Sequence, residues 1–361
     1  MRHPGGRFGW LVAMGVLLSA ASTAATRDDF LHGSGSLGPV TLPFRYFVPP
    51  GYDPSHAYPL ILFLHGAGER GTDNEAQLDN QANGAMRLLD DANLAEQPVF
   101  MVAPQCWGWW SGDQLEAAVR IVDQLAAQFS IDPQRIYITG LSMGGMGTWS
   151  AVTAHPGKFA AAVPMSGNGD PADAATVRAL PFWFFHAAND GSVPVWGSRN
   201  LVSALRDAGG DIIYTEYASG GHAIWPVAYT HPQLFPWLVS QSRGAPHASI
   251  APMLRITDPT AAPTWNTEAD TLDLAGNADL GASGVSSVTW SVLGGASGSA
   301  GGGSAWTATS VPVSAPTNLV RVIASGASGH PAYAGATTVN DHLWVGHVTD
   351  RIFSSAFETI G

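Results

Sequence analysis

This 361-residue chain contains a serine, an aspartate and a histidine, in that order, that could together cleave an acyl bond. Ser142 lies in Gly140-Leu-Ser-Met-Gly144, between the strand-like segment 136–139 and helix-compatible sequence that runs to His155-Pro156. A serine at so tight a strand-to-helix turn sits on a strained bend that exposes its hydroxyl. Gly140 and Gly144 lack a Cβ atom, so they let the strand and the helix cross closely. The same five residues could form an incidental turn, but their context favours a nucleophile.

A serine hydroxyl attacks only when a neighbouring base removes its proton, and that base needs a partner to fix its tautomer. In a strand–turn–helix arrangement of this kind, the chain order is serine, acid, histidine. Asp190 follows the strand-like segment 182–185, and His222 follows the strand-like segment 211–217. We therefore predict a Ser142–His222–Asp190 triad.

Other residues compete for these two roles. Asp170 and Asp173 also follow a strand, and some hydrolases take their acid one strand earlier than the position of Asp190. His155 and His231 precede prolines and are interpreted as helix-boundary residues. His186 ends a strand, where a structural hydrogen bond is the expected role.

The negative oxygen that develops during acyl transfer needs backbone N–H donors aimed at it. One donor is expected from Met143, the residue after the nucleophile. The other should come from the loop after the apolar strand 58–64, and Ala67 is our first choice, with Gly68 next.

That loop reads His65-Gly-Ala-Gly-Glu-Arg-Gly71. We interpret His65 as a residue that shapes the loop rather than as a base. Glu69 and Arg70 are expected to form a local ion pair, and the alternative is that Arg70 contacts substrate.

Aromatic residues cluster after the next strand, at the sheet edge where open α/β sheets bind ligands. Trp107, Trp109 and Trp110, with the neighbouring Gln105, are therefore candidate substrate contacts, and the aromatic rings could stack on a sugar ring or a hydroxycinnamoyl group. The competing interpretation is that one or two of them cap the core. Cys106, in the same segment, lacks a nucleophile turn and is expected to be a packed thiol.

Strand-like and helix-like segments alternate from Val40 to about Ser240, which indicates an α/β fold with a mostly parallel sheet covered on both faces. Strands are expected at 42–48, 58–64, 99–103, 136–139, 159–163, 182–185 and 211–217, and helices at 115–129, 143–155, 201–208 and 234–240. Trp149 and Trp225 are expected to pack within this fold.

The composition changes after Ser242. From Ile250 to about Val345 the chain is rich in Gly, Ser, Ala and Thr and contains short alternating segments, which predict an antiparallel β-sandwich. The glycine-rich segment 294–303 is expected to be a flexible loop. We divide the chain into an export signal at 1–25, an α/β domain at 26–242, a linker at 243–250, a β-sandwich at 251–346 and a tail at 347–361.

Composition narrows the possible partners. The net charge is −12 and Lys158 is the single lysine, so no basic patch for nucleic acid is expected. One cysteine excludes an intrachain disulfide and a four-cysteine metal site. The triad chemistry requires no metal or organic cofactor.

The first residues have the pattern of an export signal. Arg2 and Arg7 precede a short apolar segment at 10–18, and small residues follow, with a cut expected after Ala24 or Ala25. The apolar segment is far shorter than the roughly 20 residues that span a bilayer, although an uncleaved anchor is the alternative. We expect a secreted or periplasmic protein without a membrane span.

Four stretches together resemble the α/β-hydrolase superfamily: 65–71, 140–145, 186–194 with its Asp190 and Val193-Pro194, and Gly221-His222. More narrowly they resemble its exported bacterial esterases, near feruloyl and acetylxylan esterases, polyhydroxyalkanoate depolymerases and dienelactone-hydrolase-like proteins, often labelled predicted peptidases. The resemblance covers about 42–240 and implies carboxylic ester hydrolysis by the triad. The C-terminal region resembles bacterial immunoglobulin-like or fibronectin-like modules, and the segment 351–358 resembles a short terminal motif of exported proteins.

Three hypotheses follow for function. The first is a serine esterase that acts on a small or polymeric ester, with the C-terminal module as a spacer or as a binder of polysaccharide or polyester. The second is a serine peptidase of the same fold. The third is a surface-binding protein whose α/β domain is inert. Trp265, Trp290, Trp306 and Trp344 of the module could serve such binding or could all be core.

Overall fold

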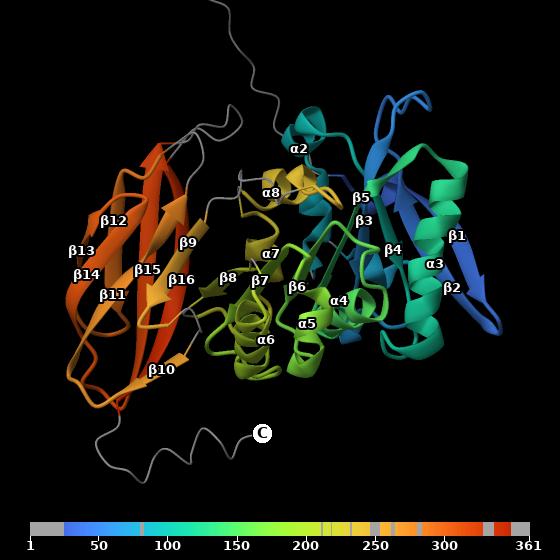
Figure 1. The fold of residues 1–361 in the computed structure, drawn as a ribbon. Coiled ribbons are helices and arrows are strands. Elements are labelled where there is room, and N and C mark those ends of the chain that lie inside the picture. The colour runs from blue at the N-terminus through green and yellow to red at the C-terminus, as the bar shows by residue number, and fades with distance from the viewer. Residues whose placement is uncertain are drawn as a thin grey trace, which may run out of the picture.

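The computed structural model describes residues 25–79, 83–210, 212–217, 219–231, 233–245, 253–260, 264–279, 284–327 and 336–347. The expected export signal up to residue 24, most of the linker and the terminal motif at 351–358 lie outside these ranges. Within them, every helix is too short or too polar to cross a bilayer. The described chain forms an α/β domain and, beside it, an all-β module (Figure 1).

The α/β domain is built on one eight-stranded sheet in the order β1-β2-β4-β3-β5-β6-β7-β8. The strands from β4 to β8 run parallel, while β1 and β2 form an antiparallel extension at one edge. The strands are β1 (Phe30–Leu37), β2 (Val40–Phe47), β3 (Tyr58–Leu64), β4 (Phe100–Pro104), β5 (Ile131–Leu141), β6 (Ala161–Met165), β7 (Phe182–Ala187) and β8 (Ile212–Tyr217). This arrangement confirms the predicted fold class.

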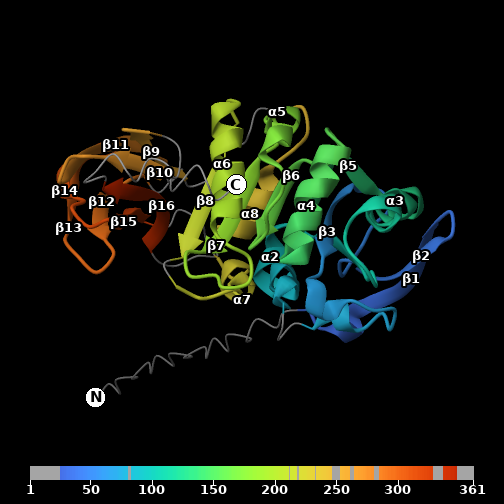
Figure 2. The same ribbon diagram turned by 90° about the horizontal axis from the view of Figure 1, so that it is seen from below.

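Helices cover both faces of the sheet (Figures 1 and 2). One face packs against α3 (Gly112–Gln128), α4 (Met143–Ala154), α5 (Ala174–Val177) and α6 (Trp196–Asp207). The other face packs against α7 (Trp225–Ala228), α8 (Leu234–Ser240) and the 3₁₀ turn η4 (Ala85–Leu89), with α2 (Asp91–Glu96) at its margin. Since both faces are covered, the central strands can be apolar throughout.

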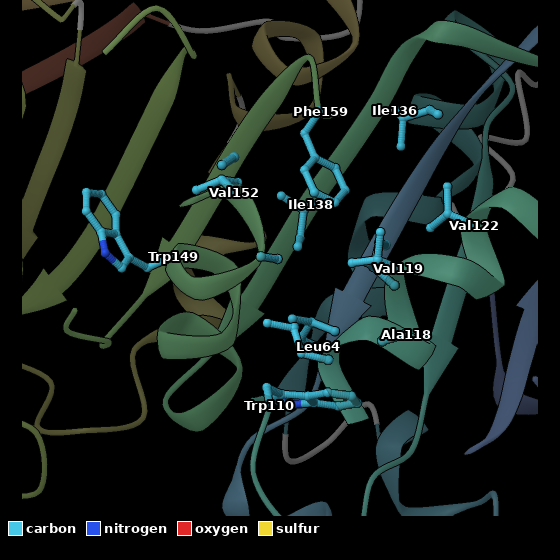
Figure 3. Close-up of a cluster of buried hydrophobic side chains, with 14 of the residues drawn as sticks. Leu64, Trp110, Ala118, Val119, Val122, Ile136, Ile138, Trp149, Val152 and Phe159 are labelled. Carbon is cyan, nitrogen blue, oxygen red and sulfur yellow. The ribbon is translucent and has the colours of Figure 1, made fainter. Parts of the chain in front are cut away.

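β3 shows how alternate residues build the two cores. Leu62 and Leu64 point into the core under α3 and α4, whereas Ile61 and Phe63 point into the opposite core. In Figure 3, Leu64 lies among side chains of α3, α4 and β5. A one-residue shift of this strand would exchange the two sets, so the double burial fixes its register.

The C-terminal module consists of strands that enclose a separate apolar core. The strands are β9 (Met253–Asp258), β10 (Thr264–Thr267), β11 (Thr271–Asp279), β12 (Ser287–Val292), β13 (Ser297–Gly302), β14 (Ala305–Pro312), β15 (Thr317–Ala327) and β16 (Ala336–His347). Trp306 is buried in this core, Trp290 packs against it, and Trp265 is 37% exposed. The side chain of Trp344 lies outside the described set.

The expectation of a flexible loop at 294–303 is wrong, because β13 occupies most of this segment. β13 pairs with β12 on one side and with β14 on the other. A Cβ atom on Gly298 would lie 2.7 Å from the Trp290 ring, so the missing side chain makes room for the indole. Backbone pairing and this cross-strand contact order a segment whose composition alone suggested flexibility.

A polar contact joins the two parts of the chain. β8 is the last strand of the α/β sheet, and β16 of the module lies beside it. Arg206 of α6 and Asp341 of β16 are both buried and approach within 3.9 Å, and Asp341 also accepts a hydrogen bond from the Ile256 N–H. Glu216 of β8 is held nearby by a two-point pair with Arg199. Charged side chains are thus buried where the module meets the edge strand.

Substitution of Gly144 tests the close packing at the start of α4. A Cβ atom at this position would lie 1.9 Å from the Leu64 carbonyl oxygen, a backbone atom that cannot turn away. We expect Gly144→Ala to lower the free energy of unfolding by about 3 kcal/mol or more. Urea unfolding followed by circular dichroism measures this change.

Gly191→Ala is the matched control, because an added Cβ there meets no atom within 4 Å. A Gly144→Ala protein as stable as the Gly191→Ala protein would contradict the close approach of the two backbones.

Candidate active site

Ser142 occupies a single-residue bend between β5 and α4. Its backbone has φ 54° and ψ −117°, a conformation that residues with a Cβ rarely adopt and that costs of order 1–3 kcal/mol. Two hydrogen bonds hold the bend: the Ser142 N–H donates to the Met165 carbonyl at 2.8 Å, and the Met146 N–H donates to the Ser142 carbonyl at 3.0 Å. The neighbouring strand and the first turn of α4 therefore impose the strain.

Glycines let three backbones meet around this bend. A Cβ atom on Gly140 would lie 2.3 Å from the Gly144 carbonyl oxygen, and one on Gly145 would lie 2.5 Å from the Met165 carbonyl oxygen. These contacts agree with the steric role predicted for Gly140 and Gly144. Gly145 has the same role against β6.

The three residues of the predicted triad lie in one hydrogen-bonded chain. Ser142 Oγ is 2.8 Å from His222 Nε2, and His222 Nδ1 is 2.7 Å from Asp190 Oδ2. Each residue follows a different strand: β5, β7 and β8. Because parallel strands end at the same edge of the sheet, residues 80 positions apart in the chain come into contact.

The environment of Asp190 favours its ionised form. Burial opposes ionisation, but hydrogen bonds from His222 and from the Ser192 and Val193 N–H groups outweigh it and hold the pKa of the carboxyl below its usual range. An ionised Asp190 fixes the proton of the imidazole on Nδ1 and leaves Nε2 free to accept the serine proton.

The loop that carries His222 is tied to its neighbours by side chains that the sequence analysis did not single out. Asn189 Oδ1 accepts a hydrogen bond from the Gly221 N–H at 2.9 Å, and Ser166 Oγ donates to the His222 carbonyl at 3.2 Å. Gly221 has φ +63°, which a side chain would disfavour. Asn189 lies directly before Asp190, so adjacency to the acid was the available signal.

The rival residues lie in other contacts. Asp170 Oδ1 accepts a hydrogen bond from the Ala172 N–H, and Asp173 is exposed. His155 pairs with Glu116 at 2.9 Å, and the His231 ring packs edge-on against Trp183. The structure therefore brings together the first-choice acid and base, and not these four.

The two proposed oxyanion donors occupy equivalent positions. Met143 is the first residue of α4, and Ala67 is the first residue of the 3₁₀ turn η2 (Ala67–Glu69), with Gly68 the second. N–H groups at such positions have no acceptor within their own helix, so they are available to a ligand. A Cβ on Gly66 would lie 2.7 Å from the Leu141 side chain, so η2 begins close to the serine bend.

His65 is buried and cross-links two loops. Its Nδ1 lies 2.7 Å from the Gly66 carbonyl, and its Nε2 accepts a hydrogen bond from the Cys106 N–H at 3.1 Å. The Trp110 indole N–H donates to the His65 carbonyl at 2.9 Å. Both ring nitrogens are engaged, and burial lowers the pKa of His65 to about 4, so it is neutral. This geometry agrees with a loop-shaping residue.

The expected Glu69–Arg70 ion pair is not among the ion pairs of the described residues. Arg70 Nε instead donates to the Ala67 carbonyl at 3.0 Å, and its guanidinium lies over the Trp109 ring at 5.8 Å. Burial raises the pKa of Glu69, and the Gly66 N–H opposes this shift. The prediction was wrong because the Arg70 guanidinium contacts the Ala67 carbonyl and the Trp109 ring instead.

The four candidate substrate contacts divide into two pairs. Trp107 and Trp109 are 46% and 55% exposed and remain candidates. Trp110 and Gln105 are buried, so a substrate-binding role for them is not supported. Gln105 accepts a hydrogen bond from the Asn74 N–H and donates to the Glu69 carbonyl and to Asp73, so it braces the loop that holds Ala67.

Three further side chains pack as expected. Cys106 is buried, and burial raises the pKa of its thiol to about 12, which leaves it protonated. Trp149 is buried against Phe182. Trp225 is buried too, with its ring edge-on to His222 at 5.1 Å.

The buried His65 should make stability depend on pH. Its pKa is about 4 in the folded protein and near 6.5 when exposed, so between these values the unfolded chain binds a proton that the folded chain does not. Stability should therefore fall as the pH falls through this window, by up to about 3 kcal/mol from this group. His65→Gln should show a shallower decline in urea unfolding between pH 6.5 and 4.5.

His56→Gln serves as the control, because the His56 side chain is 73% exposed. If His65→Gln and His56→Gln change the slope equally, the assignment of a neutral, buried His65 is wrong.

Comparison with known proteins agrees with this fold. A model of the prolyl oligopeptidase family matches residues 104–184. A bifunctional acetylxylan esterase/xylanase of Neocallimastix patriciarum is 30% identical over 151 residues, which are 41% of this chain and 22% of that protein. Poly(3-hydroxyalkanoate) depolymerase C of Paucimonas lemoignei is 28% identical over 194 residues, 52% of this chain and 45% of that protein. The chain thus spans less than half the length of either relative.

A solved structure extends the likeness. A thermostable esterase superposes on 60% of this chain and 64% of its own, with a TM-score of 0.58 and 40% sequence identity. The residues that the family model matches include β5, Ser142 and α4. The α/β domain therefore has the α/β-hydrolase fold and is similar to carboxylic ester hydrolases.

Proposed function

We propose that this protein is a secreted serine hydrolase that cleaves carboxylic esters through an acyl-enzyme. The observation that carries the proposal is the hydrogen-bonded chain from Ser142 Oγ through His222 to Asp190, at a strained bend where the hydroxyl is held clear of the sheet. The identity of 40% to a solved esterase supports the same reaction class.

In the acylation step, His222 Nε2 takes the Ser142 proton as the oxygen attacks the ester carbonyl. Asp190 keeps the imidazole in the required tautomer and stabilises its charged form. The N–H groups of Met143 and Ala67 would bind the developing oxyanion, and loss of one such donor typically costs about 10²–10³ in rate. His222 then protonates the leaving alcohol.

Deacylation repeats these roles with water as the nucleophile. His222 removes a proton from water, the hydroxide attacks the acyl-enzyme, and the proton returns to Ser142 as the acid product leaves. The histidine is partly exposed, so water can reach it.

The proposed organisation assigns this chemistry to residues 26–242, with an export signal at 1–25, a linker at 243–250, the all-β module at 251–346 and a tail at 347–361. Export is inferred from the charged, apolar and small residues at the start of the sequence.

Peptide hydrolysis is the second candidate, because the matching family model is described as the prolyl oligopeptidase family. Amide cleavage needs stronger protonation of the leaving group and an extended peptide site. Parallel assays on acetyl, butyryl, feruloyl and hydroxybutyrate esters and on chromogenic peptides separate the two. Higher kcat/KM for the peptides would replace the esterase proposal.

Replacement of Ser142 tests the nucleophile. Ser142→Ala should reduce kcat for p-nitrophenyl acetate by on the order of 10⁴-fold or more, with the melting temperature preserved. Ser150→Ala, on the same helix, should retain activity.

Full activity of Ser142→Ala would refute the triad. If the wild-type protein hydrolyses no ester or peptide but adsorbs to xylan, cellulose or polyhydroxybutyrate, the protein is a binding protein with an inert hydrolase domain.

Trp107 and Trp109 are proposed to contact the substrate near the oxyanion loop. Aromatic stacking contributes about 0.5–1.5 kcal/mol, so Trp109→Ala should raise KM for methyl ferulate about 3- to 10-fold and leave methyl acetate unchanged. Trp265→Ala, an exposed tryptophan of the β-module, is the control. Equal effects of Trp109→Ala on both esters would contradict stacking on the acyl group.

A further inference from the structure

A second histidine contacts the carboxylate of Asp190. His186 is fully buried in β7, four residues before the acid. Its Nε2 lies 3.2 Å from Asp190 Oδ2, the oxygen that also binds His222 Nδ1 at 2.7 Å. One carboxylate oxygen therefore lies between two imidazoles, of which the catalytic steps above use one.

The surrounding atoms determine which nitrogen of His186 carries a proton. Nε2 lies 3.0 Å from the Val193 carbonyl as well as near the ionised Asp190, and both groups only accept. An N–H must therefore stand at Nε2. Nδ1 lies 2.7 Å from Ser198 Oγ, whose one hydroxyl hydrogen can point to Nδ1 or to the Gly167 carbonyl at 3.0 Å. Burial lowers the pKa of His186 despite the nearby Asp190, which agrees with a neutral ring protonated on Nε2.

With this tautomer, four donors surround the carboxylate. Ser192 and Val193 donate their N–H groups to Oδ1, at 2.8 and 2.9 Å, and His222 and His186 donate to Oδ2. An ionised carboxylate has about four acceptor positions, so rotation of Asp190 would break several of these bonds at once.

His186 also ties the acid loop to the rest of the sheet edge. Its single Nε2–H is shared between Asp190 Oδ2, at 3.2 Å, and the Val193 carbonyl, at 3.0 Å, and so links both ends of the turn that starts at Asp190. Through Ser198 its other nitrogen is linked to α6, and the Ser198 hydroxyl oxygen lies 3.0 Å from the Gly167 carbonyl after β6. The ring thus connects the acid to two neighbouring elements.

From these contacts we propose that His186 is a positioning residue, whose Nε2–H fixes the Asp190 carboxylate in the orientation that His222 requires. This inference rests on the proposed triad. The N–H also withdraws negative charge from Oδ2, so its removal should make Asp190 hold the His222 proton more tightly. Asp190 and His222 are the ionisable groups that act on His186.

Two substitutions distinguish the role of His186 Nε2 from that of Nδ1. His186→Asn keeps a polar group near Ser198 but removes the donor to Asp190, whereas the longer His186→Gln places an amide N–H near the former Nε2. We expect His186→Asn to lower kcat for p-nitrophenyl acetate about 10- to 100-fold and to move the acid limb of its kcat/KM profile to higher pH. His186→Gln should restore most of the rate, and its kcat/KM should fall at the same acidic pH as that of the wild-type protein.

Ser198→Ala is the matched control for a merely structural role. It removes the other hydrogen bond of the same buried ring and leaves the Nε2–H in place. We expect a lower melting temperature with an unchanged acid limb. If His186→Asn and Ser198→Ala both lower the melting temperature and neither moves the limb, His186 is only a packing residue and the inference is wrong.

The rate at which a fluorophosphonate labels Ser142 gives a readout that does not depend on the ester chosen. Slower labelling in His186→Asn than in His186→Gln supports the inference, and equal labelling overturns it. Labelling of the Ser142→Ala protein at the wild-type rate would instead refute the triad itself, so the two failures are distinguishable.

Discussion

The close approach of three backbones around Ser142 is the constraint on which the site depends. Gly140, Gly144 and Gly145 leave no space for a side chain against β3, α4 and β6. Because these contacts are between backbone atoms, no side-chain rotation can make room for a group added at these positions. They also set the distance between the serine and the loop after β3, which carries the second proposed oxyanion donor. One set of glycines therefore positions both the nucleophile and the groups that would stabilise its product.

The loops at this sheet edge are ordered by buried polar side chains. His65, Gln105 and Asn74 satisfy backbone groups of neighbouring loops, and Arg45 of β2 donates to the Asn74 carbonyl at 2.9 Å and pairs with Glu75. Such groups are costly to bury unless they are paired, so each one holds its loop in a single arrangement. These buried hydrogen bonds preorganise the loops of the site, including the loop that carries the exposed Trp107 and Trp109.

The sequence was informative where a rule links residue type to backbone path. Alternating apolar segments predicted the parallel strands, and chain order selected Asp190 and His222, which the structure brings to Ser142. It was less informative where composition misled: β13 is rich in glycine, yet it is ordered by pairing with β12 and β14. It also could not tell which loop side chains turn inward, so Trp110 and Gln105 were grouped with the exposed tryptophans. Those directions are set by contacts between loops that are distant in the chain.

Because the chain is synthesised from its N-terminus, β8 is made well before β16, which contacts it. β8 ends at Tyr217, whereas β16, which lies beside it, begins only at Ala336. As the chain emerges, the α/β sheet can therefore be complete while its last edge is still uncovered and while Arg206 lacks Asp341. Unpaired strand edges invite association with other chains. The all-β module would then be the last segment to cover this edge.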